Sequence, residues 1–332
     1  MSRTNKYYDV REDRQKWRSL NILIGARRIG KTFSIIDYCC TELGERKFIY
    51  LRNTEKQIAT CCSSFGNPFK KYNAVKGRNI FIKNTKECGY IYDGTDEDNP
   101  LLIGYAVALS TFQNLRGVSL DDVDIVFFDE FIEKRRLQFD QFNTFMDFYD
   151  TINDNREDEG RESLRVFMAS NAQKLNSPIL AGFNLISPIE SMVTSGQKSY
   201  SRGKIWVSLP VAAISEMRKV MGLSQEIEGT AYYDETINNK FANDDFTGIG
   251  KKKLIEYHGF ARIDDIYIYR HKSNGTLYCC SVPCSNVQQY SSQVNRLLLL
   301  AGLFPVLAAA YAENKLYFSD FTVKSKLFDI LK

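Results

Sequence analysis

Residues 25–32 carry a glycine-rich pattern that can bind phosphate groups. They read, in order, Gly25-Ala26-Arg27-Arg28-Ile29-Gly30-Lys31-Thr32, which is the complete phosphate-loop pattern G-x-x-x-x-G-K-[ST]. In such a loop the backbone amides cradle the phosphates, the lysine reaches the β- and γ-phosphates, and the threonine ligates Mg²⁺. Glycine allows the tight curl because it has no Cβ to clash. We therefore expect all of these residues to contact ATP, with Thr32 also on Mg²⁺.

Asp129 and Glu130 supply the acidic groups that a phosphate loop needs for hydrolysis. They follow the apolar run 125–128, which indicates a buried strand of a parallel sheet. Asp129 then stands at the carboxyl end of that strand, where α/β sheets place ligand chemistry. We assign Asp129 to Mg²⁺ through water and Glu130 to polarising the attacking water. A glutamate directly after the aspartate favours an ATPase over a nucleotide kinase or a nucleotide-operated switch.

A polar pair, Ser170 and Asn171, follows another apolar strand expected at residues 164–169. At the end of that strand the pair, and Asn171 in particular, can sense the γ-phosphate and relay its loss. Because serine and asparagine also favour turns, an ordinary turn is the alternative interpretation.

The surrounding sequence predicts the elements that position these groups. A strand is expected at residues 20–24 and a helix at 33–40, so that strand, glycine loop and helix N-terminus form one anion site. A further strand is expected at 48–52, and a hairpin within 79–92. The alternation of buried strands and helices up to residue 195 indicates an α/β fold with a mainly parallel central sheet.

Composition and charge indicate an ordinary globular chain. Its 332 residues suffice for one large or two moderate domains, and 44% of them are hydrophobic. The net charge of +4 excludes a strongly basic tail, so that nucleic-acid contacts must come from local patches. The eight cysteines include adjacent pairs but no C-x-x-C pair of pairs, and the two histidines do not complete a zinc set. We expect free thiols in a reducing cytosol.

The uncharged segment 297–312 is the part most easily mistaken for a membrane span. It is shorter than a span and contains Gly302 and Pro305, so we expect one or two buried helices and no membrane partner. Because polar residues follow Met1, we expect no signal peptide.

A change in composition at residues 195–203 predicts a domain boundary. We expect a P-loop ATPase domain over residues 1–195, a linker region over 196–228 and a C-terminal domain over 229–332. The C-terminal domain should begin with a hairpin around the Asn274-Gly275 turn, with helices following it.

Several of these features together resemble the small DNA-packaging ATPases of short-tailed phages, which are terminase-like P-loop motors of the ASCE type. The features are the chain length, the glycine motif near residue 25, Phe-Asp-Glu-Phe-Ile at 128–132 and Ser-Asn-Ala at 170–172. The resemblance covers residues 15–175 and is looser afterwards. It implies a ring of identical subunits, a homopentamer by resemblance, that docks on a procapsid portal and drives double-stranded DNA inward with ATP. The location implied is the host cytoplasm, transiently on the procapsid, and participation of a structural RNA stays open.

The resemblance further implies that the C-terminal domain is a smaller α+β domain resembling a vestigial RNase H-type nuclease. Such a nuclease needs several carboxylates, one of them inside its first strand. We expect that strand at residues 266–270, which contain no acid. Asp264 and Asp265 precede it and, being consecutive, would point to opposite faces of a strand. The sequence thus favours a lost metal site without deciding whether any nuclease activity is kept.

The resemblance also implies an arginine that completes the catalytic site of the neighbouring subunit. Arg156 lies about where the family carries a basic finger, although Asp154 stands where an arginine is expected. Arg116 lies where related packaging motors carry a basic residue. Both stay candidates, with a surface salt bridge as the alternative for each. Arg27, which the family also shows, and Arg52 could face the nucleotide or a subunit boundary.

Lys134, Arg135 and Arg136 directly follow the acidic strand, where a loop could face a central pore. Mobile lysines and arginines suffice there, because phosphate contacts dominate non-specific DNA binding. We therefore predict that this loop contacts double-stranded DNA. Residues 70–78 form a second basic cluster, whereas the run 251–253 is more simply a solvated face.

Two functions follow from these expectations. The first is an ATP-driven DNA translocase that packages a phage genome, and the alternative is a P-loop ATPase that loads or remodels a protein or helicase partner without sustained translocation. Stimulation of ATP hydrolysis by DNA separates them. Ring size, step size and coupling lie beyond what the sequence determines.

Overall fold

The computed structural model divides the chain into two compact units. The first comprises residues 1–183 and 191–243, and the second comprises residues 184–190 and 244–332. The structure describes residues 6–42, 45–84, 88–115, 120–133, 137–154, 156, 158–172, 175–219, 222–230, 233–234, 237, 241, 247–294 and 296–331.

A nine-stranded sheet with the order β3-β4-β5-β2-β6-β7-β1-β9-β8 forms the centre of the first unit. Its inner strands are parallel: β5 (Leu101–Ala108), β2 (Lys47–Arg52), β6 (Val123–Asp129), β7 (Arg165–Ser170), β1 (Leu20–Ile24) and β9 (Ile205–Ser208). At the edges, β3 (Ile80–Asn84) pairs antiparallel with β4 (Gly89–Asp93), and β8 (Ser199–Arg202) pairs antiparallel with β9. This sheet confirms the predicted α/β fold, and β7 separates the glycine-loop strand from the acidic strand as in ASCE ATPases.

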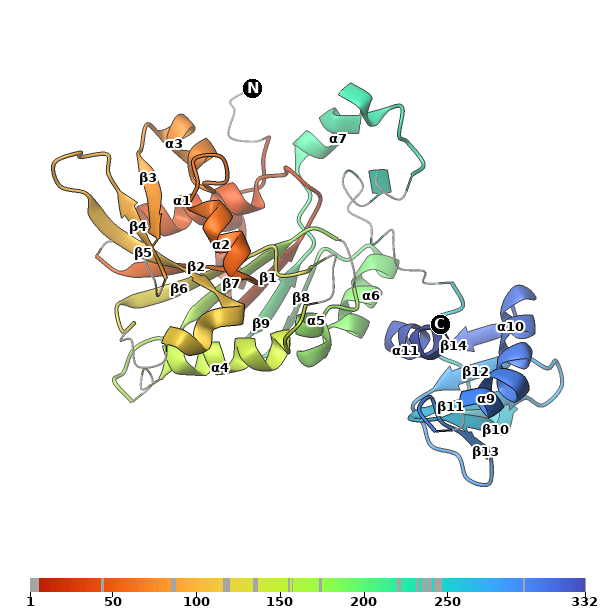
Figure 1. The fold of residues 1–332 in the computed structure, drawn as a ribbon. Coiled ribbons are helices and arrows are strands. Elements are labelled where there is room, and N and C mark those ends of the chain that lie inside the picture. The colour runs from red at the N-terminus through yellow and green to blue at the C-terminus, as the bar shows by residue number, and fades with distance from the viewer. Residues whose placement is uncertain are drawn as a thin grey trace. The chain divides into compact units, whose positions relative to one another are not determined.

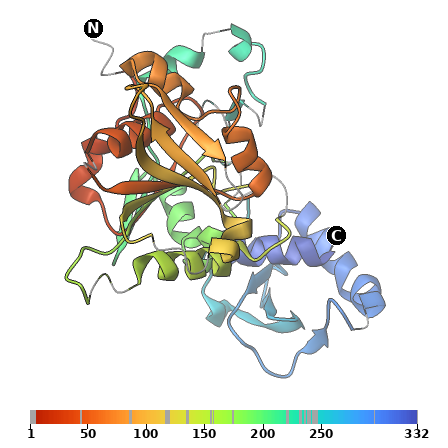
Figure 2. The same ribbon diagram turned by 60° about the vertical axis from the view of Figure 1, so that its left-hand side comes forward.

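Helices cover both faces of this sheet, which is why its inner strands are apolar throughout (Figures 1 and 2). On one face lie α1 (Lys31–Glu42), α2 (Glu55–Cys61) and α3 (Lys70–Lys76), and on the other lie α4 (Gln141–Asn153) and α5 (Pro178–Gly182). Consecutive phenylalanines of β6 point to opposite faces. Phe127 packs on Tyr50, with ring centroids 5.6 Å apart, and Phe128 stacks on Phe145 of α4 at 6.0 Å. Two layers of aromatic side chains thus hold β6 in place.

Further helical segments complete the part of the chain before residue 244. They are η2 (Val10–Lys16), η3 (Leu109–Leu115), α6 (Ile186–Ser195), α7 (Ala213–Lys219) and η4 (Gly222–Ser224).

The linker predicted over residues 196–228 needs correction, because β8 and β9 lie within it and belong to the sheet. β9 pairs in parallel with β1, with Ile205 opposite Leu20. Gly203, which has a left-handed φ of 55°, lies in the turn that joins β8 to β9. The small polar residues that suggested a linker therefore reflect this edge hairpin.

The second unit contains a five-stranded sheet with the order β13-β10-β11-β12-β14. β10 (Tyr257–Ile263), β11 (Ile266–His271) and β12 (Leu277–Cys280) are antiparallel, whereas β13 (Gln288–Tyr290) and β14 (Leu316–Phe318) pair in parallel with β10 and β12. Its helical segments are η5 (Leu254–Glu256), α9 (Arg296–Leu298), η6 (Leu299–Leu303), α10 (Phe304–Ala312) and α11 (Phe321–Leu331). The predicted hairpin is β11 and β12, and the unit is α+β as expected.

The first strand of this sheet is β10 and not, as predicted, the strand beginning at Ile266. The sequence interpretation missed β10 because Gly259 and a shift of register interrupt its alternation. β10 also contains no acidic residue. In the described part of the chain, no three or more His, Cys, Asp or Glu side chains are grouped so that they could hold a metal ion. Loss of a nuclease metal site stays a prediction.

The apolar segment 297–312 is helical, but it is not buried as a whole. Leu299, Leu303 and Leu307 form a buried stripe at a spacing of four residues. Leu297 is 83% exposed and Phe304 is 37% exposed. The prediction of buried helices is therefore wrong for the outer side of this segment. Within the described ranges, no helix has the length and apolar character needed to cross a membrane.

Candidate nucleotide-binding and catalytic site

The glycine loop joins the buried strand β1 to the first turn of α1. Gly30 has a φ of 112°, and a Cβ at this position would lie 2.9 Å from the carbonyl oxygen of Tyr8. A residue with a side chain is therefore strained there. The amide of Tyr8 donates to the carbonyl oxygen of Ile29 at 2.9 Å, and Arg218 of α7 donates to the carbonyl oxygen of Arg27. These contacts hold the loop at the N-terminus of α1, in the position for anion binding.

Lys31 is buried and lies directly behind the glycine loop. Its Nζ donates to the carbonyl oxygens of Gly25, at 2.7 Å, and Ala26, at 2.8 Å. Burial lowers the pKa of Lys31 to about 7, although the nearby charges of Asp129 and Glu130 act in the opposite direction. Phosphate oxygens can replace the two carbonyl oxygens as acceptors and bring negative charge. Anion binding should therefore favour the protonated form of this amine.

Thr32 and Asp129 meet between the first turn of α1 and the carboxyl end of β6. The Thr32 hydroxyl donates to Asp129 Oδ1 at 3.1 Å. Asp129 Oδ2 accepts the hydroxyl of Tyr50 at 2.9 Å and lies 3.5 Å from Nη1 of Arg52. Burial raises the pKa of Asp129, and Arg52 only partly offsets this effect. A buried carboxylate beside a hydroxyl gives the oxygen-only donor set that suits Mg²⁺, so these two residues fit the predicted metal site.

Glu130 lies at the rim of this site, with its carboxylate held by an arginine. Nη2 of Arg52 is 2.6 Å from Glu130 Oε2, and the Glu130 side chain is 54% exposed. The Glu130 backbone has a left-handed φ of 53° and donates to the carbonyl oxygen of Ala169 at 2.7 Å. A positive φ at a residue other than glycine is uncommon and is often found at functional positions. The chain thus turns sharply after Asp129 and presents Glu130 to solvent.

Arg52 is the residue whose importance the sequence interpretation underestimated. The sequence suggested only that it faces nucleotide or a subunit boundary, whereas the structure places it against both acidic residues of the site. β2 and β6 are parallel neighbours, with Leu51 opposite Phe128, so the next residue of each strand lies at the same edge. Once these strands are known to be adjacent, the position of Arg52 follows.

The buried Asn53 and Gln141 and the half-buried Glu133 form a hydrogen-bond network beneath the turn at Glu130, and the sequence carried no signal for it. Asn53 Nδ2 donates to the carbonyl oxygen of Glu130 at 3.2 Å and to Glu133 Oε1 at 2.9 Å. Gln141 Nε2, at the start of α4, donates to Asn53 Oδ1 at 2.6 Å and to the carbonyl oxygen of Phe131 at 2.7 Å. The network ties the segment after β6 to both β2 and α4.

The end of β7 contacts the glycine loop directly. The amide of Gly25 donates to the carbonyl oxygen of Ser170 at 3.1 Å. Asn171 follows Ser170 at the same edge of the sheet as Asp129. This position agrees with a polar residue near the γ-phosphate, and the sensing role stays a prediction.

Arg156 lies at the other end of the sheet from this site. Its side chain is 2% exposed, and Nη1 donates to Asp124 Oδ1, near the start of β6, at 3.2 Å. The structure therefore does not bring Arg156 together with Asp129 and Glu130 of the same chain. The other predicted finger, Arg116, and the predicted DNA-contacting residues Lys134, Arg135 and Arg136 lie outside the described residues.

In comparison with known proteins, the chain is similar to phage packaging proteins. Residues 2–261 match the family described as Podovirus DNA encapsidation protein (Gp16). The chain is 28% identical over 260 residues to the DNA packaging proteins of Bacillus phages PZA and phi29, and each match covers 73% of this chain and 70% of the relative.

Solved structures of packaging motors share the fold. A chain of the bacteriophage Phi-29 viral genome packaging motor assembly has a TM-score of 0.63 at 20% identity, with 98% of this chain and 99% of that chain covered. A chain of the Phi-28 gp11 DNA packaging motor has a TM-score of 0.58 at 16% identity, with 96% and 95% covered.

Proposed function

We propose that this chain, which belongs to the Podovirus DNA encapsidation protein (Gp16) family, is the ATP-hydrolysing subunit of a phage DNA-packaging motor. The observation that carries the proposal is the meeting of Lys31, Thr32, Asp129 and Glu130 at one edge of the sheet. A protein that only binds nucleotide does not need the exposed glutamate beside the buried aspartate. The relatives with which it aligns are named DNA packaging proteins.

ATP binding uses the glycine loop and α1. Lys31 exchanges the two carbonyl oxygens for oxygens of the β- and γ-phosphates, and the loop amides hold the remaining phosphate oxygens. Thr32 directly and Asp129 through water would hold Mg²⁺, which would neutralise charge on the phosphates. The proton on Lys31 is stabilised as the phosphates approach.

Hydrolysis uses Glu130. A water oxygen bonds to the γ-phosphorus while the bond from that phosphorus to the β,γ-bridging oxygen breaks, giving ADP and phosphate. Glu130 polarises this water, and Arg52 positions the carboxylate for this role by holding its Oε2 atom. Asn171, at the end of β7, is the residue we assign to sensing loss of the γ-phosphate.

We assign the arginine that acts on a neighbouring subunit to Arg156 or Arg116. Such an arginine stabilises charge on the phosphoryl group that is transferred. Arg156 can act in this way only after leaving Asp124, because its side chain is buried in the present arrangement. Combining an Arg156→Ala or Arg116→Ala subunit with an Asp129→Ala subunit should partly restore ATP hydrolysis. If every mixture stays inactive, neither arginine acts on its neighbour.

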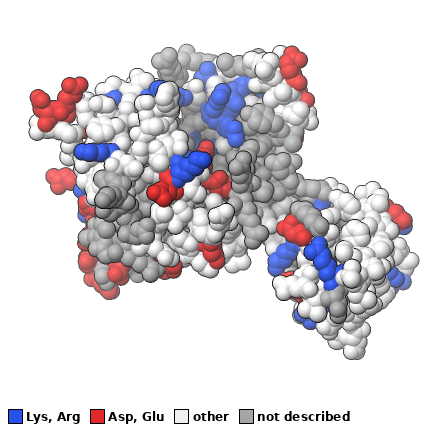
Figure 3. Space-filling model, viewed as in Figure 1, with Lys and Arg blue, Asp and Glu red and all other residues white. Residues whose placement is uncertain are grey.

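We assign DNA contact to Lys134, Arg135 and Arg136, which follow the segment held by Asn53 and Gln141. On the face shown in Figure 3, lysines and arginines lie in several groups separated by acidic and uncharged residues. A motor that grips any sequence through the DNA backbone needs only local groups of this kind.

The assembly we propose is a homo-oligomeric ring on the portal of a procapsid, in the host cytoplasm. The supporting observation is the similarity in fold to chains of two packaging-motor structures. A pentamer and a structural RNA are finer possibilities that sedimentation of the assembled particle, with and without ribonuclease, distinguishes.

The decisive experiment measures ATP hydrolysis by the purified full chain with and without double-stranded DNA. We expect DNA to stimulate the wild type and Glu130→Gln to be inactive in both conditions. Reversing the charges of Arg135 and Arg136 should abolish the stimulation, preserve basal hydrolysis and lower the salt dependence of DNA binding by about one unit of slope per lost phosphate contact. An equal rate of ATP hydrolysis with and without DNA would favour the alternative function, an ATPase that remodels a protein partner.

A further inference from the structure

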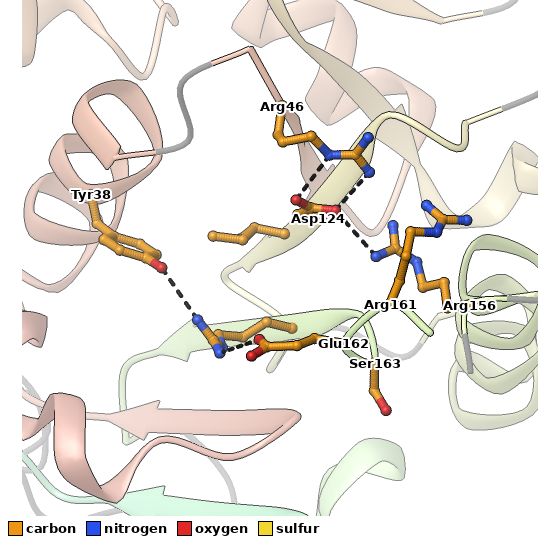
Figure 4. A pocket seen from close by; sticks show the side chains of 9 residues that line it. Tyr38, Arg46, Asp124, Arg156, Arg161, Glu162 and Ser163 are labelled. Carbon is orange, nitrogen blue, oxygen red and sulfur yellow. Dashed lines mark hydrogen bonds and ion pairs between the residues drawn. The ribbon is translucent and has the colours of Figure 1, made fainter. Parts of the chain in front are cut away.

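Four arginines line a cavity at the edge of the sheet opposite the glycine loop. The cavity has a volume of about 330 Å³ and is lined by Tyr38, Arg46, Asp124, Ile125, Arg156, Arg161, Glu162, Ser163 and Arg165 (Figure 4). We call it the arginine pocket. Asp124, at the start of β6, is five residues before Asp129, so about 17 Å of strand separates the pocket from the metal-site carboxylate.

Asp124 organises one side of the pocket. Arg46 donates to it from Nε at 2.9 Å and from Nη2 at 2.7 Å, and Arg156 donates to the same carboxylate at 3.2 Å. Figure 4 shows Arg46 and Arg156 reaching Asp124 from two sides, with Arg161 beside Arg156. One carboxylate thus fixes the position of two guanidinium groups.

Two arginine donors in this wall lack an acceptor. Nη2 of Arg156 and Nε of Arg161 are both buried and have no hydrogen-bond partner among the residues that the structure describes. The Arg156 side chain as a whole is 2% exposed. Its Nε donates only weakly to the carbonyl oxygen of Ile152, at 3.4 Å. Buried donors without acceptors are uncommon in native proteins, and a bound ion is one of the groups that can supply the acceptors.

The other groups of the wall also leave the balance of charge positive. Arg165 donates to the Tyr38 hydroxyl and to Glu162, both at 3.3 Å, and Arg161 pairs with Glu159 at 2.6 Å. Among the residues that line the pocket, four guanidinium groups therefore face two carboxylates, those of Asp124 and Glu162. Outside this lining, Glu159 pairs with Arg161, and Asp121 and Asp122 lie near Arg46. Two of the arginine contacts, at 3.3 Å, are long for charge-assisted bonds.

We propose that the arginine pocket is a second anion site, which binds a small phosphate-class oxyanion independently of the glycine loop. Planar guanidinium groups match the oxygens of such an anion and can donate to it in pairs. Phosphate oxygens would satisfy Nη2 of Arg156 and Nε of Arg161 together. The anion is either free in solution or part of a nucleic-acid backbone, and the two sources share this chemistry.

The test is calorimetric titration of the full chain with inorganic phosphate and with pyrophosphate. The Lys31→Ala background is used, so that anions bound by the glycine loop do not contribute. We expect one pyrophosphate per chain, with affinity reduced at least about tenfold by Arg156→Gln and by Arg161→Gln. Arg78→Gln is the matched control, because Arg78 also pairs with an aspartate, Asp93, but lies outside the pocket. It should leave the affinity unchanged.

Circular dichroism reports whether each variant folds. If Arg156→Gln does not fold, Arg161→Gln alone tests the proposal.

A short DNA duplex then identifies the source of the anion. If the duplex displaces pyrophosphate, and does not do so in Arg161→Gln, the pocket binds backbone phosphate. If the duplex displaces no pyrophosphate, the pocket binds a free anion.

The proposal is overturned if the Lys31→Ala chain binds no pyrophosphate. Equal affinity in all the arginine variants, or binding only in assembled oligomers, also overturns it. None of these results depends on whether the chain hydrolyses ATP.

Discussion

Strand β6 carries an aspartate near each end, and the two have opposite electrostatic properties. Asp129, at the carboxyl end, is buried, and its pKa is raised chiefly by that burial. Asp124, at the amino end, is partly exposed, and hydrogen bonds from Arg46 and Arg156 lower its pKa although burial acts against them. The same residue type on the same strand is thus poised to take a cation at one end and is already neutralised by arginine at the other.

The difference shows that depth of burial and the number of charged donors decide what an aspartate can do. Asp129 has two neutral hydroxyl donors and one distant guanidinium, so its charge is poorly compensated until a cation binds. Asp124 has three guanidinium hydrogen bonds and needs no cation. Catalysis therefore takes place at the carboxyl end of β6, where the charge of Asp129 is poorly compensated.

The largest effect is expected from Glu130→Gln. Loss of the carboxylate that polarises water should lower the turnover number by about 10²- to 10⁴-fold while ATP still binds. Steady-state hydrolysis together with equilibrium ATP binding measures both quantities. Asp122→Asn, an acidic residue before the amino end of β6, is the control and should keep its activity. If Glu130→Gln hydrolysed ATP at the wild-type rate, the carboxyl end of β6 would not be the catalytic end of the strand.

Lys31→Ala should weaken ATP binding by about 100-fold, because the phosphates lose a charged donor whose hydrogen bonds contribute about 1.5–3 kcal/mol. The pKa of about 7 in the nucleotide-free chain makes a second expectation possible. Above this pH, ATP binding should take up protons, because the phosphates favour the charged amine. Calorimetry in buffers of different ionisation enthalpy measures the uptake. Equal uptake by Lys31→Ala would assign the proton to another group.

Arg52→Gln should lower turnover by about tenfold, since Glu130 loses its positioning partner and Asp129 loses its nearest positive charge. Arg52 lowers the pKa of Asp129, so its removal should move the acid limb of the pH–rate profile to higher pH. Arg52→Lys keeps the charge without the planar fork and should restore the pH limb but not the full rate. An unmoved acid limb would show that Arg52 does not act through Asp129.

The smallest effects are on stability, and they should have opposite signs at the two ends of β6. Asp124 has a lowered pKa, so its stabilisation is present above pH 3.8 and is lost as the pH falls through the folded-state value. Asp129 has a raised pKa, so the folded state is favoured below pH 3.8 and this advantage is lost as the pH rises through the folded-state value. At pH 7, without nucleotide, Asp124→Asn should destabilise the chain and Asp129→Asn should stabilise it.

Urea denaturation from pH 7 down to pH 3 measures both changes. The Asp124→Asn loss should be only about 1 kcal/mol, because the carboxylate is 37% exposed and solvent screens the pair. The Asp124→Asn difference should shrink as the pH falls below 3.8. The Asp129→Asn difference should shrink earlier, as the pH falls through the raised folded-state pKa of Asp129, and should be absent below pH 3.8. Changes of the same sign at pH 7 would show that the two aspartates are not electrostatically different.

The sequence by itself determined the local parts of this protein. The glycine loop between β1 and α1, the acidic end of β6 and the parallel character of the sheet follow from short-range patterns of apolar residues and glycine. These patterns are local because a phosphate loop needs its residues at consecutive positions. The sequence did not predict β10, β8 or β9, since short or interrupted strands are defined by their partners.

Only the tertiary structure decided which distant side chains meet. Arg52 reaches Asp129 and Glu130 because β2 lies beside β6, and Asn53 reaches Gln141 because α4 begins beneath the same turn. The burial of Arg156 against Asp124 likewise depends on where the chain returns after α4. No pattern within one segment encodes these contacts, because strand order is set by packing of the whole sheet and its covering helices.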